Sequence, residues 1–354
     1  MTRSPGLRMT RVGAVGLGLA FSAFANLAAM NTADAQIAYD SPNGRVVVMG
    51  LRRWTLAMLQ DSIRHYVPGQ ELHDAACMVT LRESLHFAEA SVERFDMTMP
   101  GQPTHSFLTI KVVEPDQADR IQWDTRPRNE FSSILPDYAT LALSITDTTG
   151  AVWRGRMLYW LQFHDAVQRQ AALYGAPEAR RADAERVATF LDQHRNERDR
   201  ARAMRVLSND GFWVNRMLAV AVLSNFAAND STWWTLVRSL RDPHEAVREA
   251  AGQVLHAMPA RPIDWRNSTT DLRLLVGGTN LPAIQTVFEL LARTEISPLL
   301  AGPLLRNNGD WVLDHLGAET PMAGDAAHRL LVRLNAGRDL GMSRSAWESW
   351  VRAL

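Results

Sequence analysis

Apolar residues in the segment 240–258 recur with the period of an α-helix. They are spaced three and four residues apart, which places them on one helical face. The positions are Val247, Ala250, Ala251, Val254, Leu255 and Met258. Asp242 is expected to cap this helix, with Pro243 in its first turn and Glu245 completing a capping box. Pro259 follows the apolar stripe and is expected to end the helix.

A shorter apolar stripe precedes this helix. Its members are Trp233, Leu236, Val237 and Leu240. The two stripes therefore predict two amphipathic helices that meet at a turn around Arg241 and Asp242. Such a pair cannot bury both of its apolar faces alone, so further copies of the same unit are expected beside it.

The predicted copies are present in the sequence. Thirty-three residues before the reference stripe, five of six positions are apolar, and the set is Val214, Met217, Leu218, Ala221, Val222 and Asn225. Thirty-seven residues after it, the set is Ile284, Val287, Phe288, Leu291, Ala292 and Glu295. A fourth copy lies at 304–317, where the turn is kept and the stripe is lost after Leu316. Repetition at this spacing predicts an α-solenoid, and the alternative is an ordinary helical bundle.

The best copy resembles the HEAT-like repeats, in particular the short bacterial repeats also seen in phycobilin lyase-type (PBS lyase HEAT-like) proteins. The matching positions are Asp242, Pro243, Val247, Arg248, Ala251 and Leu255. The C-terminal segment is similar to the closing segment of bacterial HEAT-repeat proteins, with Trp347 and Trp350 three residues apart. The resemblance covers roughly the last 150 residues, and it implies a fold more than an activity. For the two tryptophans, sealing of the last apolar face is the simpler interpretation.

The first half of the chain has a different pattern. A short strand is expected from Arg45, then a helix around Trp54 to Ile63 and a second helix from about Glu71 to Leu85. Strand-like runs begin at Ala90 and at Ser106, and alternation at Leu141, Leu143 and Ile145 predicts a hairpin. We therefore expect an α+β domain with a mixed or antiparallel sheet. The polar stretch 114–129 is expected to be an exposed loop, either a binding edge or a connector.

The predicted organisation has four parts. They are a signal peptide (1–35), an α+β domain (36–157), a charged helical connector (158–205), and HEAT-like repeats with a C-terminal capping helix (206–354). In the connector, acidic and basic residues alternate around a short apolar seam, which is typical of a solvated helix face. A coiled-coil partner helix is the alternative for that seam.

The N-terminus has the order of a secretory signal. Arg3, Arg8 and Arg11 precede an apolar stretch, and a small-residue site ends at Ala35. Cleavage there predicts an exported protein, periplasmic or extracellular, that has no membrane span in its mature form. The alternative is an uncleaved anchor, although glycine, serine and asparagine dilute the apolar run.

Charge and cysteine content narrow the function classes. The whole chain has 38 basic and 38 acidic residues, so removal of three arginines and Asp34 leaves 35 against 37, a net charge of −2. Such a surface does not attract polyanions, so we expect no nucleic-acid partner. Cys77 is the sole cysteine, which excludes an intramolecular disulfide. Stability must therefore come from burial of the apolar residues.

Catalytic motifs are sparse. Cys77 has His73 four residues earlier, and Asp74 could orient the imidazole, so a Cys-His nucleophile is one interpretation. The other is that Cys77 is a small buried apolar residue. The sequence has no HExxH, GxSxG, phosphate-loop or dinucleotide motif, so no metal and no cofactor are expected.

These patterns favour a non-catalytic scaffold. It would bind a protein or peptide through a large contact area on the solenoid surface. The candidate contacts are Arg241, His244, Arg248 and Asn215, which fall in turns or on outward helix faces. Each could equally be a solvated surface residue. The alternative function is an envelope enzyme, hydrolase-like or lyase-like, with its site around Cys77. A lyase-like activity has only the analogy to phycobilin lyase-type proteins behind it.

Overall fold

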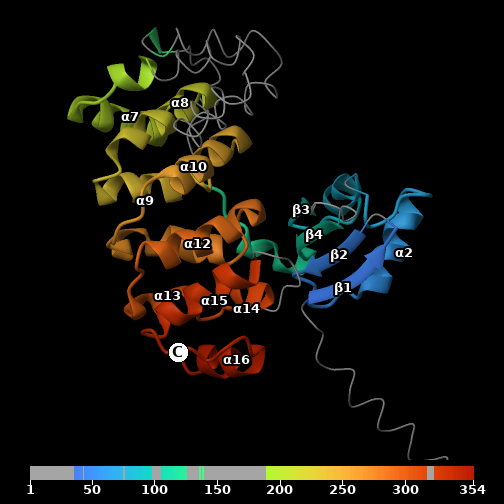
Figure 1. The fold of residues 1–354 in the computed structure, drawn as a ribbon. Coiled ribbons are helices and arrows are strands. Elements are labelled where there is room, and N and C mark those ends of the chain that lie inside the picture. The colour runs from blue at the N-terminus through green and yellow to red at the C-terminus, as the bar shows by residue number, and fades with distance from the viewer. Residues whose placement is uncertain are drawn as a thin grey trace, which may run out of the picture. The chain divides into compact units, whose positions relative to one another are not determined.

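The computed structural model describes residues 36–42, 44–74, 76–97, 105–125, 135, 136, 138, 189–316 and 323–354. Its N-terminal region contains a four-stranded mixed sheet (Figure 1). The strands are β1 (Gln36–Ser41), β2 (Gly44–Met49), β3 (Glu89–Met97) and β4 (His105–Val113). Their order is β1-β2-β4-β3, with β2 and β4 parallel and the two outer pairs antiparallel. The mixed sheet agrees with the α+β prediction, whereas β1 was not predicted.

Both faces of β2 are covered by other elements. Val46 and Val48 pack into one apolar cluster, and Val47 and Met49 pack into another. This explains why the strand is a continuous apolar run and does not alternate with polar residues. The first cluster lies between the sheet and the helix α2 (Leu56–Tyr66), which Thr55 caps by accepting a hydrogen bond from the Met58 amide.

The second predicted helix is shorter than expected. Instead of starting near Glu71, it starts as α3 (Cys77–Val79) and continues as one π-helical turn, η1 (Thr80–Ser84). The Asp74 carboxylate accepts a hydrogen bond from the Glu71 amide (2.8 Å), and the Asp74 carbonyl accepts one from the Cys77 amide (2.9 Å). These local bonds close a turn that competes with a helix over the preceding residues.

The C-terminal part is mostly helical. Its α-helices are α7 (Glu197–Asn209), α8 (Trp213–Leu223), α9 (Asp230–Ser239), α10 (Glu245–Ala257), α11 (Thr269–Val276), α12 (Ile284–Arg293), α13 (Ala301–Leu305), α14 (Asp310–Leu316), α15 (Ala323–Leu334) and α16 (Arg344–Arg352). Short helical turns are η2 (Pro115–Arg120), η3 (Ser224–Phe226), η4 (Trp265–Ser268), η5 (Leu281–Ala283) and η6 (Pro298–Leu300). Helices α7 and α8, α9 and α10, and α11 and α12 pack as pairs, while α14 packs on α15 and α16.

The predicted apolar stripes are the buried faces of these helices. All six reference positions on and just after α10 are buried, and so are the five apolar positions on α8 and the five on α12. In the fourth copy, α14 buries Trp311, Val312, Leu313 and Leu316. On α16, Trp347 is buried and its ring centroid lies 5.5 Å from that of Trp350. Helical periodicity was therefore a sufficient signal for the core of these elements.

The predicted capping of α10 by Asp242 is wrong. The helix begins at Glu245, and its N-cap is His244, whose Nδ1 accepts a hydrogen bond from the Ala246 amide (3.3 Å). The Asp242 carboxylate instead pairs with Arg216 of α8 and accepts the His244 amide (2.9 Å). An ion pair with a residue of another helix has thus replaced the local cap that the sequence predicted.

The sheet and the helices share one core. Val47, Met49 and Val113 of the sheet belong to the same apolar cluster as the buried faces of the helices. At the end of β2, Gly50 lies directly against the Trp311 ring, where no side chain fits. The described residues between Gln36 and Leu354 belong to one compact unit.

In the described part of the chain, no single helix is long and apolar enough to cross a membrane. One pair, Trp265–Val276 with Leu281–Arg293, meets the same criteria only when taken together and is bent by 114°. The predicted signal peptide (1–35), the predicted hairpin at 141–145 and the first part of the connector (158–188) lie outside the described residues.

Candidate functional site

Turns connect α7 to α8, α9 to α10, α11 to α12 and α13 to α14, and the first three of these turns are linked to one another. These turns are 210–212, 240–244, 277–280 and 306–309. Arg216, just after the first turn, forms an ion pair with Asp242 of the second (2.9 Å). Asn280 of the third turn has a left-handed backbone (φ 66°), and its Nδ2 donates to the Leu240 carbonyl of the second (2.6 Å). Neighbouring helix pairs are therefore joined by polar bonds at their turns as well as by the apolar core.

Residues 120–125, which begin at the last residue of η2 and continue without helix or strand, cross these turns and are called the crossing segment below. It starts at the fourth turn, where the Arg120 side chain donates to the Asn307 carbonyl (3.3 Å) and pairs with Asp310 (2.9 Å). At the next turn, the Thr279 hydroxyl donates to the Arg120 carbonyl (3.0 Å) and accepts from the Gln122 amide (3.1 Å). One hydroxyl thus satisfies two main-chain groups of the segment.

The segment then reaches the second turn. Arg241 Nε donates to the Gln122 carbonyl (2.9 Å), and the Arg241 carbonyl accepts from the Asp124 amide (2.7 Å). Arg238 pairs with the Asp124 carboxylate (2.9 Å). Farther along the chain, the Leu135 amide donates to Asn215 Oδ1 beside the first turn (3.1 Å).

The described contacts of residues 120–125 and of Leu135 therefore follow the turns in reverse order, from 306–309 to the end of 210–212. Four of these bonds are made by the main chain of the crossing segment, at Arg120, Gln122 and Asp124. Such bonds depend on the course of a peptide backbone and carry little dependence on its sequence. The row of turns is thus a surface that holds a non-helical polypeptide.

Two of the four sequence-predicted contact residues are part of this arrangement and are not exposed. The side chains of Asn215 and Arg241 are buried, with relative exposures of 0% and 9% for the residues. Arg241 also pairs with Asp271. His244 stacks on Trp213, with ring centroids 4.3 Å apart and an interplanar angle of 1°. Of the four, Arg248 alone lines the pocket described next.

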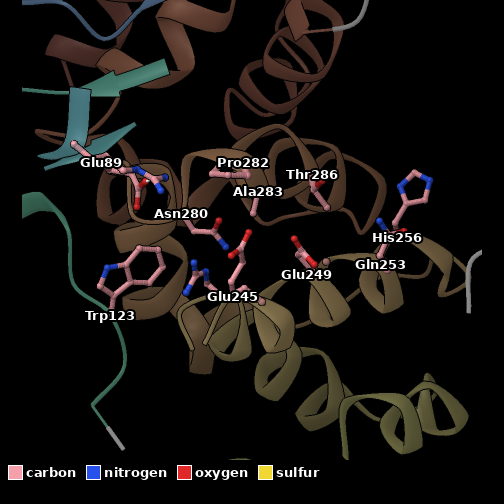
Figure 2. Close-up of a pocket in the computed structure, with 13 residues that line it drawn as sticks. Glu89, Trp123, Glu245, Glu249, Gln253, His256, Asn280, Pro282, Ala283 and Thr286 are labelled. Atoms are coloured by element: carbon pink, nitrogen blue, oxygen red, sulfur yellow. The ribbon is translucent and has the colours of Figure 1, made fainter. Parts of the chain in front are cut away.

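A pocket of about 630 Å³ opens beside the crossing segment (Figure 2). It is lined by Arg82, Glu89, Trp123, Glu245, Arg248, Glu249, Gly252, Gln253, His256, Asn280, Pro282, Ala283 and Thr286. Figure 2 shows one side formed by α10, from Glu245 to His256, and the facing side by Pro282, Ala283 and Thr286 of η5 and α12. Trp123 of the crossing segment and Glu89 at the start of β3 complete it.

The two arginines of the pocket are held in place. The Arg248 guanidinium lies 4.2 Å from the Trp123 ring centroid and donates to the carbonyls of Asp242 (2.8 Å) and Pro243 (3.1 Å). Burial lowers the pKa of Arg248 from its ordinary value, but a guanidinium stays charged in proteins. Arg82 pairs with Glu89 (2.6 Å). The pocket therefore offers fixed donors at one end and the carboxylates of α10 along its side.

Cys77 lies elsewhere, in the apolar cluster between α2 and the sheet. The residue is fully buried, and its thiol donates to the Leu72 carbonyl (3.4 Å) and not to His73. Burial raises the pKa of the Cys77 thiol to about 12, and the nearby Asp74 carboxylate adds to the increase. The thiol is therefore protonated at neutral pH, whereas a nucleophile needs the thiolate.

Within the ranges that the structure describes, no cluster of three or more His, Cys, Asp or Glu residues could hold a metal ion. Neither Trp123 nor Thr279, which are central to the site, was predicted from the sequence. The sequence did contain a signal for Trp123, because it is a lone tryptophan within the polar stretch 114–129. Thr279 gave no local signal, because its role depends on a segment that is distant in the sequence.

Comparison with models of known protein families and with curated proteins finds no match to this sequence.

Proposed function

We propose that this chain is an exported, non-catalytic scaffold that binds a protein or peptide partner on the surface of a HEAT-like solenoid. The partner would lie along α10 and α12, in the pocket beside the crossing segment. The leader-like N-terminal sequence supports the proposal of a periplasmic or extracellular location.

The packing order of the helices supports the solenoid. Second helices contact one another in sequence order, α8 with α10 and α10 with α12, and first helices do the same, α7 with α9, α9 with α11, and α11 with α13. This order is expected when each pair buries its apolar face only against its neighbours. At the C-terminal end α15, and not α14, is the principal partner of α12, so the last unit departs from the simple repeat.

The observation that carries the functional proposal is the binding of the crossing segment by the turns. Thr279 and Arg241 bond the main chain at Arg120, Gln122 and Asp124. A surface that holds one non-helical stretch through its backbone groups has the chemistry to hold another polypeptide next to it. The pocket is directly continuous with this surface, because Trp123 of the crossing segment is part of its lining.

The pocket chemistry fits a polar peptide. Glu245 and Glu249 can accept hydrogen bonds from peptide amides or from basic side chains, and Trp123 offers an aromatic edge beside Arg248. Interfaces of this kind gain affinity from complementary area and a few aromatic or arginine anchors. Arg248 is thus the one sequence-predicted contact that we retain for the partner.

Photocrosslinking tests the proposal. A photoreactive phenylalanine analogue at Thr286, in the full-length protein made in its own cells, is expected to crosslink one major partner from the envelope. Glu249→Lys in the same protein should reduce that adduct about tenfold, because a positive charge replaces an acceptor in the pocket. The matched control is Asp325→Lys, at an exposed position of α15 outside the pocket.

The control should leave the adduct unchanged. Absence of any adduct, or an equal loss in both charge-reversal variants, would contradict binding in this pocket. The alternative enzyme would need a Cys77 thiolate, but Cys77 is fully buried and burial raises the pKa of its thiol to about 12.

A further inference from the structure

A second pocket, of about 660 Å³, lies between α12 and α15 and is separate from the one described above. It is lined by Glu289, Ala292, Arg293, His328, Arg329, Val332, Arg333 and Asp339. Three of these eight residues are arginines. With the carboxylates of Glu289 and Asp339 counted against the three arginines, the lining carries a net charge of +1 when His328 is neutral.

Arg329 and Arg333 are two neighbouring arginines of this pocket whose charges are not paired within the described residues. They lie four residues apart on α15, so their side chains are neighbours on the helix surface, and both are exposed. Within the part of the chain that the structure describes, neither side chain has an ion-pair or hydrogen-bond partner. Like charges at this spacing oppose helix formation, and a bound anion would relieve that repulsion.

The acidic residues of the pocket already have donors. Asp339 accepts from His328 Nε2 (2.7 Å) and from the Gly341 amide (2.7 Å). Glu289 accepts from Gln285 of its own helix (3.3 Å). Neither of these carboxylates forms an ion pair with Arg329 or Arg333, so the two guanidinium groups are available to a ligand.

Arg293 supplies a third positive charge on the facing wall. Its guanidinium donates to the carbonyls of Leu255 and Met258 at the end of α10, which fixes its position. The pocket thus has one immobilised cation on α12 and two exposed cations on α15. The apolar residues Ala292 and Val332 lie among them.

We propose that this pocket binds the oxyanion group of a small ligand, a phosphate or a carboxylate, through Arg329 and Arg333. A guanidinium presents a planar fork of donors that matches the oxygens of both groups. The volume is in the range of small-molecule sites. This inference does not depend on the proposed scaffold function, because it concerns a different pocket.

Calorimetric titration of the full chain tests the proposal. The probes are sodium phosphate and sodium citrate, with sodium chloride at matched ionic strength as the reference. We expect saturable binding of at least one oxyanion, and the one that binds identifies the ligand group. Arg329→Gln with Arg333→Gln should weaken it by about tenfold or more, since charge-assisted bonds are lost.

The matched control is Arg273→Gln, an exposed arginine of α11 that is not part of the pocket. It should bind as the unmodified protein does. Binding no stronger than that of chloride, or an equal loss in the Arg273 variant, would overturn the proposal. If the double variant does not fold, Arg333→Gln alone is titrated, and undiminished binding would again overturn it.

Discussion

Arg216 and Asp242 form a bidentate ion pair that is almost completely shielded from solvent. Arg216 Nε and one terminal nitrogen each lie 2.9 Å from a carboxylate oxygen of Asp242. The side-chain exposures are 4% and 0%. The remaining guanidinium nitrogen donates to the carbonyls of Asp210 and Gly211 (both 2.9 Å). One arginine thus bonds the turn of its own helix pair and the turn of the next.

Loss of the arginine alone should be strongly destabilising. Arg216→Met leaves the buried Asp242 carboxylate without its cation, so the free energy of unfolding should fall by about 3–5 kcal/mol. Urea unfolding followed by far-ultraviolet circular dichroism measures this change. The control is Arg205→Met, at an exposed position on α7, which should change stability by less than about 1 kcal/mol. Equal effects of the two substitutions would show that the pair is not buried as described.

His315 should make stability depend on pH. It is fully buried, and its Nδ1 lies 2.8 Å from the Trp311 carbonyl. Burial lowers the pKa of His315 to about 3, and the positive charge of Lys111 adds to the decrease. The unfolded chain binds this proton near pH 6.5, so the protein should lose about 1.4 kcal/mol of stability per unit as the pH falls from there toward 3.

His315→Phe removes the imidazole that binds this proton in the unfolded chain. The difference in free energy of unfolding between pH 7 and pH 5 should therefore be smaller in the variant, with the carboxylates still contributing equally to both proteins. Urea titrations at the two pH values give the difference. An unchanged pH dependence would mean that His315 already titrates normally in the folded state.

Cys77 should be inert in the folded protein. Its thiol is buried, and a thiol with a pKa near 12 provides almost no thiolate at pH 7. A chromogenic disulfide reagent should therefore react quickly only after denaturation with urea. Modification of the native protein at the rate of a free thiol would restore the enzyme alternative.

A glycine at position 50 should be required for stability, because the sheet packs closely against the helices there. It has φ +89°, and an added Cβ would lie 2.1 Å from the Val112 carbonyl oxygen and 2.5 Å from the Trp311 ring. Gly50→Ala should cost about 3 kcal/mol of stability through strain and overpacking. Gly69 is the matched control, because it has φ +88° with nothing within 4 Å, so Gly69→Ala should cost only about 1 kcal/mol. Similar losses in thermal unfolding would contradict the close packing at Gly50.

The features that were predictable from sequence are those encoded by nearby residues. The spacing of Val247, Ala250 and Val254 alone determines which face of α10 is buried, and the structure buries all three. The sheet was also predictable in outline, because β2, β3 and β4 contain strand-like runs in the sequence, whereas β1 was not predicted. The cap at Asp242 was predicted wrongly, because Arg216 lies 26 residues away and local capping rules do not include it.

The site was much less predictable than the fold. Asn215 and Arg241 were expected to be surface contacts, since Arg241 was predicted in a turn and Asn215 lies off the apolar stripe of its helix. Both are buried and bond distant parts of the chain. Asn215 accepts from the Leu135 amide, 80 residues away, and Arg241 donates to the Gln122 carbonyl of the crossing segment, 119 residues away. Periodicity within one helix contains no information about such a partner. Arg248 was found because it lies on the outward face of the best-matching repeat.

Amide hydrogen exchange of the crossing segment tests the central claim most directly, namely that the turns of successive helix pairs hold a non-helical stretch of chain by its backbone. The Gln122 and Asp124 amides donate to Thr279 and Arg241, so both should exchange about a hundredfold or more slowly than an unstructured peptide. Thr279→Val should remove the protection at Gln122 and leave that at Asp124. Exchange of both amides at the rate of an unstructured peptide would contradict the account.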